Sequence, residues 1–396
     1  MEYKPFLRLR HVFQTDQTWW DFYAKYSNRI RSAVLDTMLK LFACGTPAMG
    51  FATFRCEHHG CGHTKRIAFS CKSRYCPTCG NKATEQWVQA QLNVLPVTQW
   101  QHITFTMPCQ LWPLFAANRR LLNCLSTLAA KVCLDWCATH GVTPGIFTAL
   151  HTHGRDGCWH PHVHLSITAG GLTKDEIWKK VTFHRESLMK QWRYQIITLL
   201  RQEYPNLILP KLLKTVGESK ATWNKFLEYH YDRYWNIHIA KPTEDARQTI
   251  NYLSRYLKRP PISYTRLTHY NGRTVTYTFT SHRTNKTETI ELSTEEFIKR
   301  FARHIHDRCF RVIRYYGFLA TRVRTKLLPA VYKVLNQSVR KVVKITHAAM
   351  LKRFVKVDPR ACILCGGRML FSGMQYGKSL AELREHHQAL ATMKFC

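Results

Sequence analysis

A cluster of cysteines between residues 56 and 79 constrains the fold of this chain more than any other feature of its sequence. Five cysteines fall within 24 residues, and they are Cys56, Cys61, Cys71, Cys76 and Cys79. Tetrahedral zinc requires four soft ligands, and a Cys-x-x-Cys turn such as Cys76–Cys79 brings two thiolates together. We therefore predict a structural zinc ion bound by Cys56, Cys61, Cys76 and Cys79. Cys71 and His63 are alternative ligands, because five cysteines compete for four positions.

A second Cys-x-x-Cys turn, Cys362-Ile-Leu-Cys365, lies near the C-terminus. Two cysteines do not complete a zinc site, so this turn either carries two unliganded thiols or recruits remote ligands such as His386 and Cys396. Scattered thiols are more often small core residues, and this applies to Cys109, Cys124, Cys133 and Cys137. A disulfide framework is not expected, because no secretory signal opens the chain and the cytosol keeps thiols reduced.

The charge of the chain indicates its partner. Lys and Arg number 59 against 25 Asp and Glu, which gives the 396 residues a formal net charge of +34. Such an excess, spread along the whole chain, is typical of proteins that bind a long polyanion through several domains. An acidic membrane surface is the competing partner, but no segment approaches the ~18 uninterrupted apolar residues of a spanning helix. We therefore expect a cytoplasmic nucleic-acid-binding protein with no membrane contact.

The pattern of strands and helices predicts an α+β fold with a central antiparallel sheet and flanking helices. Alternating residues indicate strands at 101–107, 147–153, 160–168 and 234–239, and a second hairpin at 273–292. Helical spacing indicates helices over 1–50, 243–258 and the basic segment 294–358. We predict three parts, in chain order: a helical and zinc-binding module at 1–95, a sheet domain at 96–265 and a basic helical region at 266–396.

Histidines on the second strand of the central hairpin are candidate metal ligands. In His160-Pro-His-Val-His164, His162 and His164 are two positions apart, so a strand presents both imidazoles on one face. Neutral imidazole is a common metal ligand. Taken alone the pair is weak evidence, because other His-x-His pairs occur at His151/His153 and at His304/His306. An ordinary strand with satisfied histidines is the alternative interpretation.

Two tyrosines on the helix predicted at 243–258 strengthen the metal interpretation. Tyr252 and Tyr256 are four residues apart and therefore share one helix face. A buried aromatic pair is the usual meaning of this spacing, but basic residues that suit a DNA backbone surround it, namely Arg247, Arg255, Lys258 and Arg259. Phenol, with a pKa of about 10, attacks a phosphate at neutral pH only where a metal stabilises the developing charge.

The order of these motifs resembles the two-tyrosine, rolling-circle insertion-sequence transposases of the HUH nuclease superfamily. The resemblance covers about residues 50–370. It rests on Ser70-Cys-Lys-Ser-Arg-Tyr-Cys-Pro-Thr-Cys79, Ile103-Thr-Phe-Thr-Met-Pro108, His151-Thr-His-Gly154, His160-Pro-His-Val-His164 with Gly170-Gly171, Tyr252-Leu-Ser-Arg-Tyr-Leu-Lys-Arg259, Glu296-Phe-Ile-Lys-Arg-Phe-Ala-Arg-His304 and Arg314-Tyr-Tyr-Gly317.

The resemblance implies a mechanism and assigns roles. His162 and His164 would hold Mg²⁺ or Mn²⁺, and Tyr252 and Tyr256 would be paired nucleophiles that form 5′-phosphotyrosine links with single-stranded DNA. It also implies an N-terminal zinc domain. The partners would be the ends of a mobile element and its target, single- and double-stranded, in a bacterial nucleoid, and an oligomer is compatible with this activity.

The third ligand of the metal and the DNA contacts are less constrained. His151 is our first choice of third ligand because hairpin parity allows it to share the face of His162 and His164; Gln248 and His238 are alternatives. We expect Arg255, Lys258, Arg259 and Arg314 to contact DNA. A replication initiator or relaxase would use the same chemistry. A non-catalytic zinc-dependent DNA-binding protein, with Tyr252 and Tyr256 in its core, is the competing class.

Overall fold

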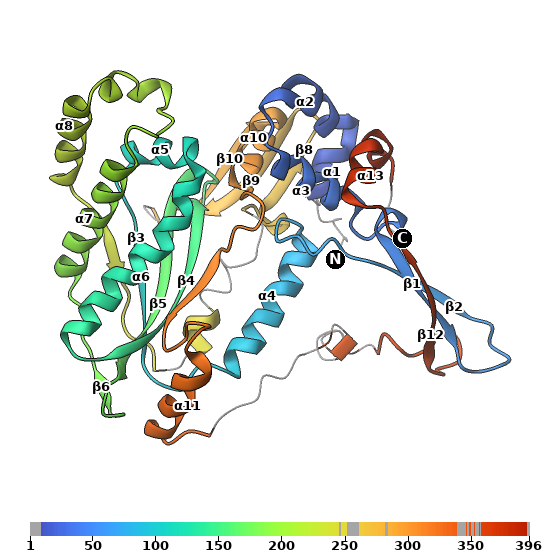
Figure 1. Cartoon of the computed structure of the whole chain (residues 1–396). Coiled ribbons are helices and arrows are strands. Elements are labelled where there is room, and N and C mark those ends of the chain that lie inside the picture. The colour runs from blue at the N-terminus through green and yellow to red at the C-terminus, as the bar shows by residue number, and fades with distance from the viewer. Residues whose placement is uncertain are drawn as a thin grey trace.

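The computed structural model describes residues 9–244, 247–251, 261–281, 284–338, 346, 348–349, 352, 356 and 358–393 (Figure 1). The predicted nucleophiles Tyr252 and Tyr256 lie outside the described residues, as do Arg255, Lys258, Arg259 and Cys396.

A six-stranded antiparallel sheet forms the centre of the protein. Its strands run in the order β11-β4-β5-β3-β7, and β6 pairs with β5. The strands are β3 (Trp100–Phe105), β4 (Thr143–His153), β5 (Trp159–Leu172), β6 (Trp178–Lys180), β7 (Ile237–Ile239) and β11 (Ile313–Gly317). The predicted α+β class and central antiparallel sheet are confirmed.

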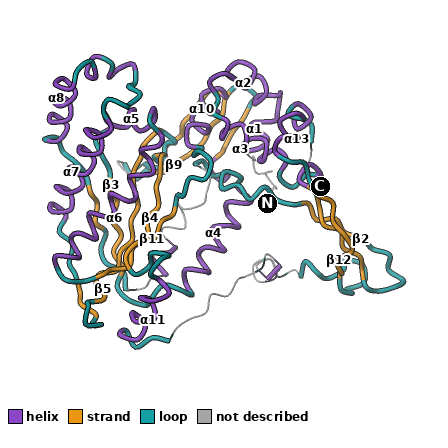
Figure 2. Tube along the Cα trace, viewed as in Figure 1, coloured by secondary structure: helices purple, strands orange, loops and turns teal. Residues whose placement is uncertain are grey.

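Four helices cover one face of this sheet (Figures 1 and 2). They are α5 (Trp112–Ala117), α6 (Leu122–Thr139), α7 (Arg185–Glu203) and α8 (Lys220–Tyr231). Alternate strand residues such as Ile103, Leu150 and Val163 point into this core and are fully or almost fully buried. Burial of such side chains stabilises the sheet by about 1.5–3 kcal/mol per residue.

The segment Arg119–Thr139 is long and apolar enough to span a membrane by length and composition. Its apolar residues are already used within the protein, since Leu125, Ala129 and Cys133 of α6 are fully buried against the sheet and α7. We interpret α6 as a core helix.

The opposite face of the sheet packs against α4 (Pro77–Leu92), the helical residues 247–251 and α11 (Arg324–Val334). Phe147 and Ala149 of β4 point to this side. Because strand residues alternate, the odd-numbered histidines of β4 share this face. This side of the sheet therefore carries the candidate metal ligands.

A second hydrophobic core joins the N-terminal helices to the second half of the chain. It contains α1 (Leu9–Gln14), α2 (Thr18–Tyr26), α3 (Ser32–Ala43), the sheet β10-β9-β8, α10 (Thr294–His304) and α13 (Leu380–Glu385). The strands of that sheet are β8 (Leu267–Tyr270), β9 (Thr274–Thr280) and β10 (Thr287–Ser293). The division at residues 95 and 265 stays a prediction, and this core crosses both boundaries.

A third sheet brings the two ends of the chain together. Its strands are β1 (Gly50–Cys56), β2 (Thr64–Ala68) and β12 (Met369–Tyr376), in the order β12-β1-β2. Gly50 has a positive φ of 77°, and a Cβ there would lie 2.4 Å from the backbone nitrogen of Gly377, so only glycine permits this approach.

The basic C-terminal region differs from the expectation of continuous helices over 294–358. Residues 313–317 form β11, which pairs with β4 at the edge of the central sheet. The segment Ile313–Gly317 contains β-branched and aromatic residues that fit a half-buried strand. Tertiary pairing with β4 therefore overrides the helical interpretation of this segment.

Candidate metal centre and cysteine clusters

Three histidines from two neighbouring strands converge on the helix-covered face that carries α4 and α11. His151 of β4 is paired with His162 of β5, and Ala149 is paired with His164, so the β-ladder places all three imidazoles side by side. Each histidine offers one ring nitrogen, and these three nitrogens lie within 4.8 Å of one another. All three side chains are buried. The structure thus brings together His151, His162 and His164.

The ring nitrogens of His162 and His164 are oriented so that both can bind one metal ion. His162 Nδ1 lies 2.8 Å from the backbone oxygen of His160, to which it donates, so the lone pair is on Nε2. This Nε2 lies 3.0 Å from Nε2 of His164. Adjacent ligands of an octahedral ion at ~2.1 Å are about 3.0 Å apart, so the spacing of these two nitrogens fits one shared divalent ion.

His102 of β3 is a neighbour that the sequence interpretation missed. Its Nε2 lies 3.1 Å from Nδ1 of His164, and its Nδ1 lies 3.4 Å from the Ser166 hydroxyl. If His164 Nδ1–H donates to His102, the lone pair of His164 is on Nε2, toward His162. Such outer hydrogen bonds orient metal-ligating imidazoles. The sequence does place His102 on the strand predicted at 101–107, where it shares one face with Thr104.

Burial keeps these imidazoles neutral. Removal from water lowers the pKa of His162 to about 3 and that of His102 to about 3, and it also holds the pKa of His164 well below its ordinary value. Neutral imidazole carries the lone pair that a metal needs. The centre is therefore ready to bind a cation at physiological pH.

The alternative third ligands are placed differently. His238 of β7 is exposed, and Gln248 is also exposed at the start of the helical residues 247–251. His238 does not belong to the group of close metal-ligating side chains that His151, His162 and His164 form. His151 stays our prediction for the third ligand.

The helical residues 247–251 pack on the same side of the sheet as the triad. Ile250 is fully buried in the cluster that contains Phe147 and Ala149 of β4. Tyr252 follows two residues later, outside the described residues.

A small pocket beside the triad contains further histidines and an arginine. It is lined by His151, His153, His304 and His306 together with Arg74, Tyr75, Leu150, Thr152 and Pro261. His304 has Nε2 2.9 Å from the Gly157 carbonyl, to which it donates, and Nδ1 3.1 Å from the Thr152 hydroxyl. Burial lowers the pKa of His153 to about 3 and that of His304 to about 4.

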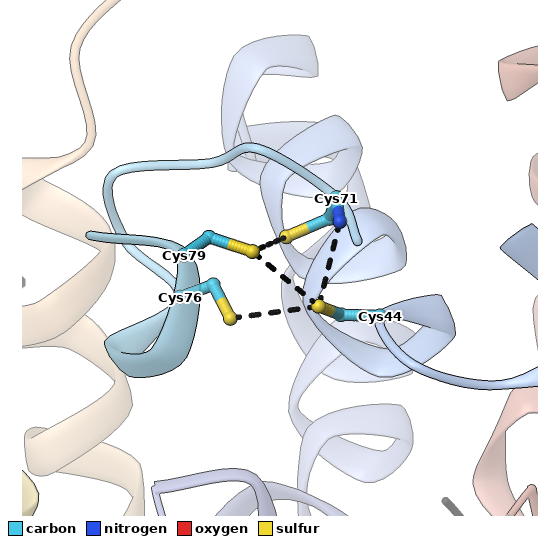
Figure 3. Close-up of side chains that lie close together, drawn as sticks. All are labelled: Cys44, Cys71, Cys76 and Cys79. Atoms are coloured by element: carbon cyan, nitrogen blue, oxygen red, sulfur yellow. Dashed lines mark hydrogen bonds between the residues drawn. The ribbon is translucent and has the colours of Figure 1, made fainter. Parts of the chain in front are cut away.

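Eight of the fifteen cysteines form two clusters of four. The first contains Cys44, Cys71, Cys76 and Cys79, all buried (Figure 3). The Sγ–Sγ separations are 3.6 Å for Cys44–Cys79, 3.6 Å for Cys71–Cys79 and 3.7 Å for Cys76–Cys44. Thiolates at ~2.3 Å from a tetrahedral zinc are about 3.8 Å apart, whereas a disulfide requires ~2.05 Å. The first cluster therefore fits zinc and contains no disulfide.

The local fold explains this first cluster. Cys44 directly follows α3, while Cys76 is the N-cap of α4 and Cys79 lies in its first turn. The positive end of a helix favours thiolate. Backbone N–H groups of Cys71 and Ser73 also point at sulfurs, at 3.4 Å from Cys44 Sγ and 3.5 Å from Cys71 Sγ.

The prediction that Cys56, Cys61, Cys76 and Cys79 bind one zinc ion together is wrong, because these residues lie in two different clusters. Cys76 and Cys79 lie with Cys44 and Cys71, whereas Cys56 and Cys61 lie with Cys362 and Cys365. The reason is topological: β1 and β2 separate the two pairs, and each pair meets cysteines from another part of the chain. The sequence prediction misses Cys44 because this cysteine stands alone, outside the cluster at residues 56–79.

The predicted DNA contact Arg314 lies on β11. Its Nη2 donates to Asn123 Oδ1 at 2.9 Å, and it lines a surface groove of about 500 Å³ with Arg311 and Tyr316. Tyr315 also lines this groove, but it is partly buried against the core, and Trp87 Nε1 donates to its hydroxyl at 2.9 Å.

Comparison with known proteins agrees with this architecture. The family described as "Putative transposase" matches residues 145–326, and the family described as "Transposase zinc-binding domain" matches residues 14–107. No solved structure matches the chain significantly.

Two relatives extend these matches. The "Transposase for insertion sequence element IS801" of Pseudomonas savastanoi pv. phaseolicola is 40% identical over 390 residues, which are 98% of this chain and 94% of that protein. The "Putative transposase y4qJ" of Sinorhizobium fredii is 29% identical over 337 residues, 80% of this chain and 82% of that protein. The chain therefore belongs to the insertion-sequence transposases. Within that class it belongs to the rolling-circle type that carries an N-terminal zinc-binding domain.

Proposed function

We propose that this transposase cleaves and joins single-stranded DNA at the histidine centre, through covalent links to Tyr252 and Tyr256. The observation that carries the proposal is the triad of His151, His162 and His164, on the sheet face against which Ile250 is buried. A buried cluster of neutral imidazoles suits a divalent cation, and the +34 charge of the chain suits DNA.

The residues divide the chemistry between them. His162 and His164, with His151, would hold Mg²⁺ or Mn²⁺, which would polarise the scissile phosphate and stabilise its developing charge. The phenol oxygen of one tyrosine forms a bond to phosphorus as the bond to the 3′ oxygen breaks. The phenol proton is lost, and the departing 3′ oxygen gains one. The products are a 5′-phosphotyrosine and a free 3′-OH.

The second tyrosine repeats this step at the other end of the element or at the target. A free 3′ oxygen then attacks a phosphotyrosine, restores a phosphodiester and releases the phenol. Because the link conserves the phosphodiester bond energy, joining requires no nucleotide cofactor. This activity also implies contact with single- and double-stranded DNA in the cytoplasm, and we place Arg255, Lys258 and Arg259 among the DNA contacts.

Zinc serves a structural role in this proposal. Cys44, Cys71, Cys76 and Cys79 would hold the zinc of the N-terminal zinc-binding domain, at the start of α4. That helix packs on the histidine face of the sheet through Trp87 and Val88.

The test is a covalent adduct. Full-length protein is incubated with single-stranded DNA that carries the ends of the element, with and without Mg²⁺ or Mn²⁺, and is analysed on a denaturing gel. We expect a metal-dependent adduct that the double variant His162→Ala/His164→Ala abolishes and that exposed Tyr229→Phe retains. Folded, DNA-binding protein that forms no adduct with either metal would support a non-catalytic binding protein instead.

A further inference from the structure

The second cysteine cluster joins the two ends of the chain. Its members are Cys56, Cys61, Cys362 and Cys365, with all four sulfurs within 4.8 Å of one another. Cys56 Sγ lies 3.4 Å from Cys365 Sγ, and Cys61 Sγ lies 3.7 Å from Cys362 Sγ, across 309 and 301 positions of sequence. These separations are too long for a disulfide. They are close to the sulfur–sulfur distance of about 3.8 Å in a tetrahedral zinc site.

The backbone at this cluster forms two tight turns on the sheet β12-β1-β2. Cys56 ends β1, and its N–H donates to His63 O at 2.9 Å. Cys362 precedes β12, and its N–H donates to Gly367 O at 2.7 Å, closing the second turn. A Cβ at Gly367 would lie 3.2 Å from Cys56 Sγ and 3.3 Å from Cys365 Sγ. Glycine therefore leaves room for the sulfurs to converge.

Hydrophobic packing does little to hold this sheet together. Along β12 only Met369 is buried, and the small core of the sheet consists of Cys56, Cys362 and Met369 in the described part of the chain. Large apolar side chains such as Phe371 and Tyr376 are exposed. Three strands without a core are marginal in water, and small modules of this kind are usually stabilised by a metal.

We propose that Cys56, Cys61, Cys362 and Cys365 bind a second structural zinc ion that fastens the C-terminal strand β12 to the N-terminal zinc module. His63 Nδ1, 3.1 Å from Cys362 Sγ, supports the thiolate by a hydrogen bond rather than as a ligand. Only Cys56 and Cys61 lie within the residues 14–107 that match the zinc-binding family, and the other two ligands come from residues 362–365. It makes the zinc module a composite of both chain ends.

Metal counting tests the second zinc. The measurement uses full-length protein with His162→Ala/His164→Ala, so that no zinc enters the histidine centre. We expect two zinc ions per chain, one after Cys362→Ser/Cys365→Ser, and two after Cys109→Ser/Cys309→Ser, which changes exposed thiols. One zinc per chain, unchanged by Cys362→Ser/Cys365→Ser, would overturn the proposal.

Thiol alkylation provides a second readout that does not require a variant to fold. In zinc-loaded protein, Cys365 is exposed and yet should be alkylated far more slowly than exposed Cys109, because a metal-bound thiolate is protected. A chelator should release Cys56, Cys61, Cys362 and Cys365 together. Alkylation of Cys365 at the rate of Cys109 before chelation would contradict a bound metal.

A separate observation concerns Arg74, on the turn between the first-cluster cysteines Cys71 and Cys76. Its Nε and Nη1 atoms are buried, and among the described residues they have no hydrogen-bond partner and no carboxylate that forms a salt bridge. The side chain lines the pocket that also contains His151, one of the triad. A buried guanidinium without an anion is costly, and planar guanidinium groups match phosphate oxygens.

We infer that Arg74 binds a DNA backbone phosphate beside the histidine centre, an inference that rests on the proposed function. The anion that the pocket lacks would arrive with the substrate. Since the first cysteine cluster fixes the turn that carries Arg74, zinc would then position a substrate-binding residue as well as stabilise the module.

Two variants with the same loss of charge test this role. Arg74→Ala should slow single-turnover adduct formation about 100-fold, as removal of a charged donor to a reacting phosphate does, and Arg74→Lys should restore part of the rate. Exposed Lys72→Gln, on the same turn, should stay near wild type. Affinity of the triad for Mn²⁺ should not change in any of them.

The outcomes distinguish this role from the activity itself. Arg74→Ala that forms adducts at the wild-type rate, with unchanged affinity for single-stranded DNA, would overturn the assignment while leaving the transposase proposal intact. If the wild-type protein forms no adduct, the activity proposal fails, and the DNA affinity of metal-loaded Arg74→Ala against Lys72→Gln still decides whether Arg74 binds phosphate.

Discussion

The histidine centre and the cysteine clusters both gather metal-ligating side chains, but different parts of the fold hold them. His151, His162 and His164 lie on paired central strands of a sheet that is packed on both faces. The clustered cysteines lie on turns and helix ends, in two small clusters that contain few other apolar side chains. We therefore expect the scaffold to hold the histidine centre in place without a bound ion, and the cysteine clusters to depend on bound zinc.

Loss of a cysteine ligand should have the largest effect. Cys44→Ser removes one ligand of the first cluster, and structural zinc sites are worth roughly 10 kcal/mol or more of apparent binding free energy. We expect loss of one zinc per chain and a large fall in melting temperature, measured by elemental analysis and calorimetry. Cys133→Ala, a buried thiol outside the clusters, should keep its zinc. Equal destabilisation by both variants would break the comparison.

The histidine centre should respond in function rather than in fold. His102→Phe removes the hydrogen bond to His164 and should weaken Mn²⁺ binding about 10- to 100-fold, with little change in zinc content. Titration calorimetry measures the affinity, and exposed His269→Phe is the control. Wild-type affinity in His102→Phe would show that the outer hydrogen bond does not orient the ligand.

The sequence predicts the histidine centre better than the cysteine clusters. Strand alternation in residues 147–168 was sufficient to predict the sheet and to place His162 and His164 on one face, because their register is local. Cys44 and the pairing of Cys56 with Cys365 could not be predicted, since tertiary packing brings these residues together across up to 309 positions. The helical prediction is wrong for residues 313–317 because their pairing with β4 is equally remote in sequence.

Acid should weaken the buried histidine region. Burial lowers the pKa of His304 to about 4, whereas an unfolded histidine titrates near about 6.5. Between these values the unfolded chain binds a proton that the folded protein does not, so stability falls as pH decreases from 6.5 toward 4 and is unaffected by this group above 6.5.

The variant His304→Gln isolates this contribution from acid release of zinc, which affects both proteins. Chemical denaturation at several pH values should give a shallower dependence of unfolding free energy on pH in His304→Gln, by up to about 1.4 kcal/mol per pH unit. Parallel pH dependences for the two proteins would contradict a neutral, buried His304.

The smallest effect is expected at the surface. Arg314→Gln should weaken DNA binding only a few-fold and should reduce the slope of log affinity against log salt by about 1. Arg201→Gln, exposed on α7 across the sheet from the histidine face, should change neither. Equal effects of the two variants would mean that the groove at β11 does not contact DNA.

The central claim is that Tyr252 or Tyr256 becomes covalently attached to DNA beside the histidine centre. The most direct measurement is mass spectrometry of peptides from the protein–DNA adduct, digested with protease and nuclease. The account predicts a metal-dependent 5′-phosphotyrosine on Tyr252 or Tyr256 that is absent from Tyr252→Phe/Tyr256→Phe. A nucleotide attached to any other residue, or an adduct that survives in the double variant, would contradict it.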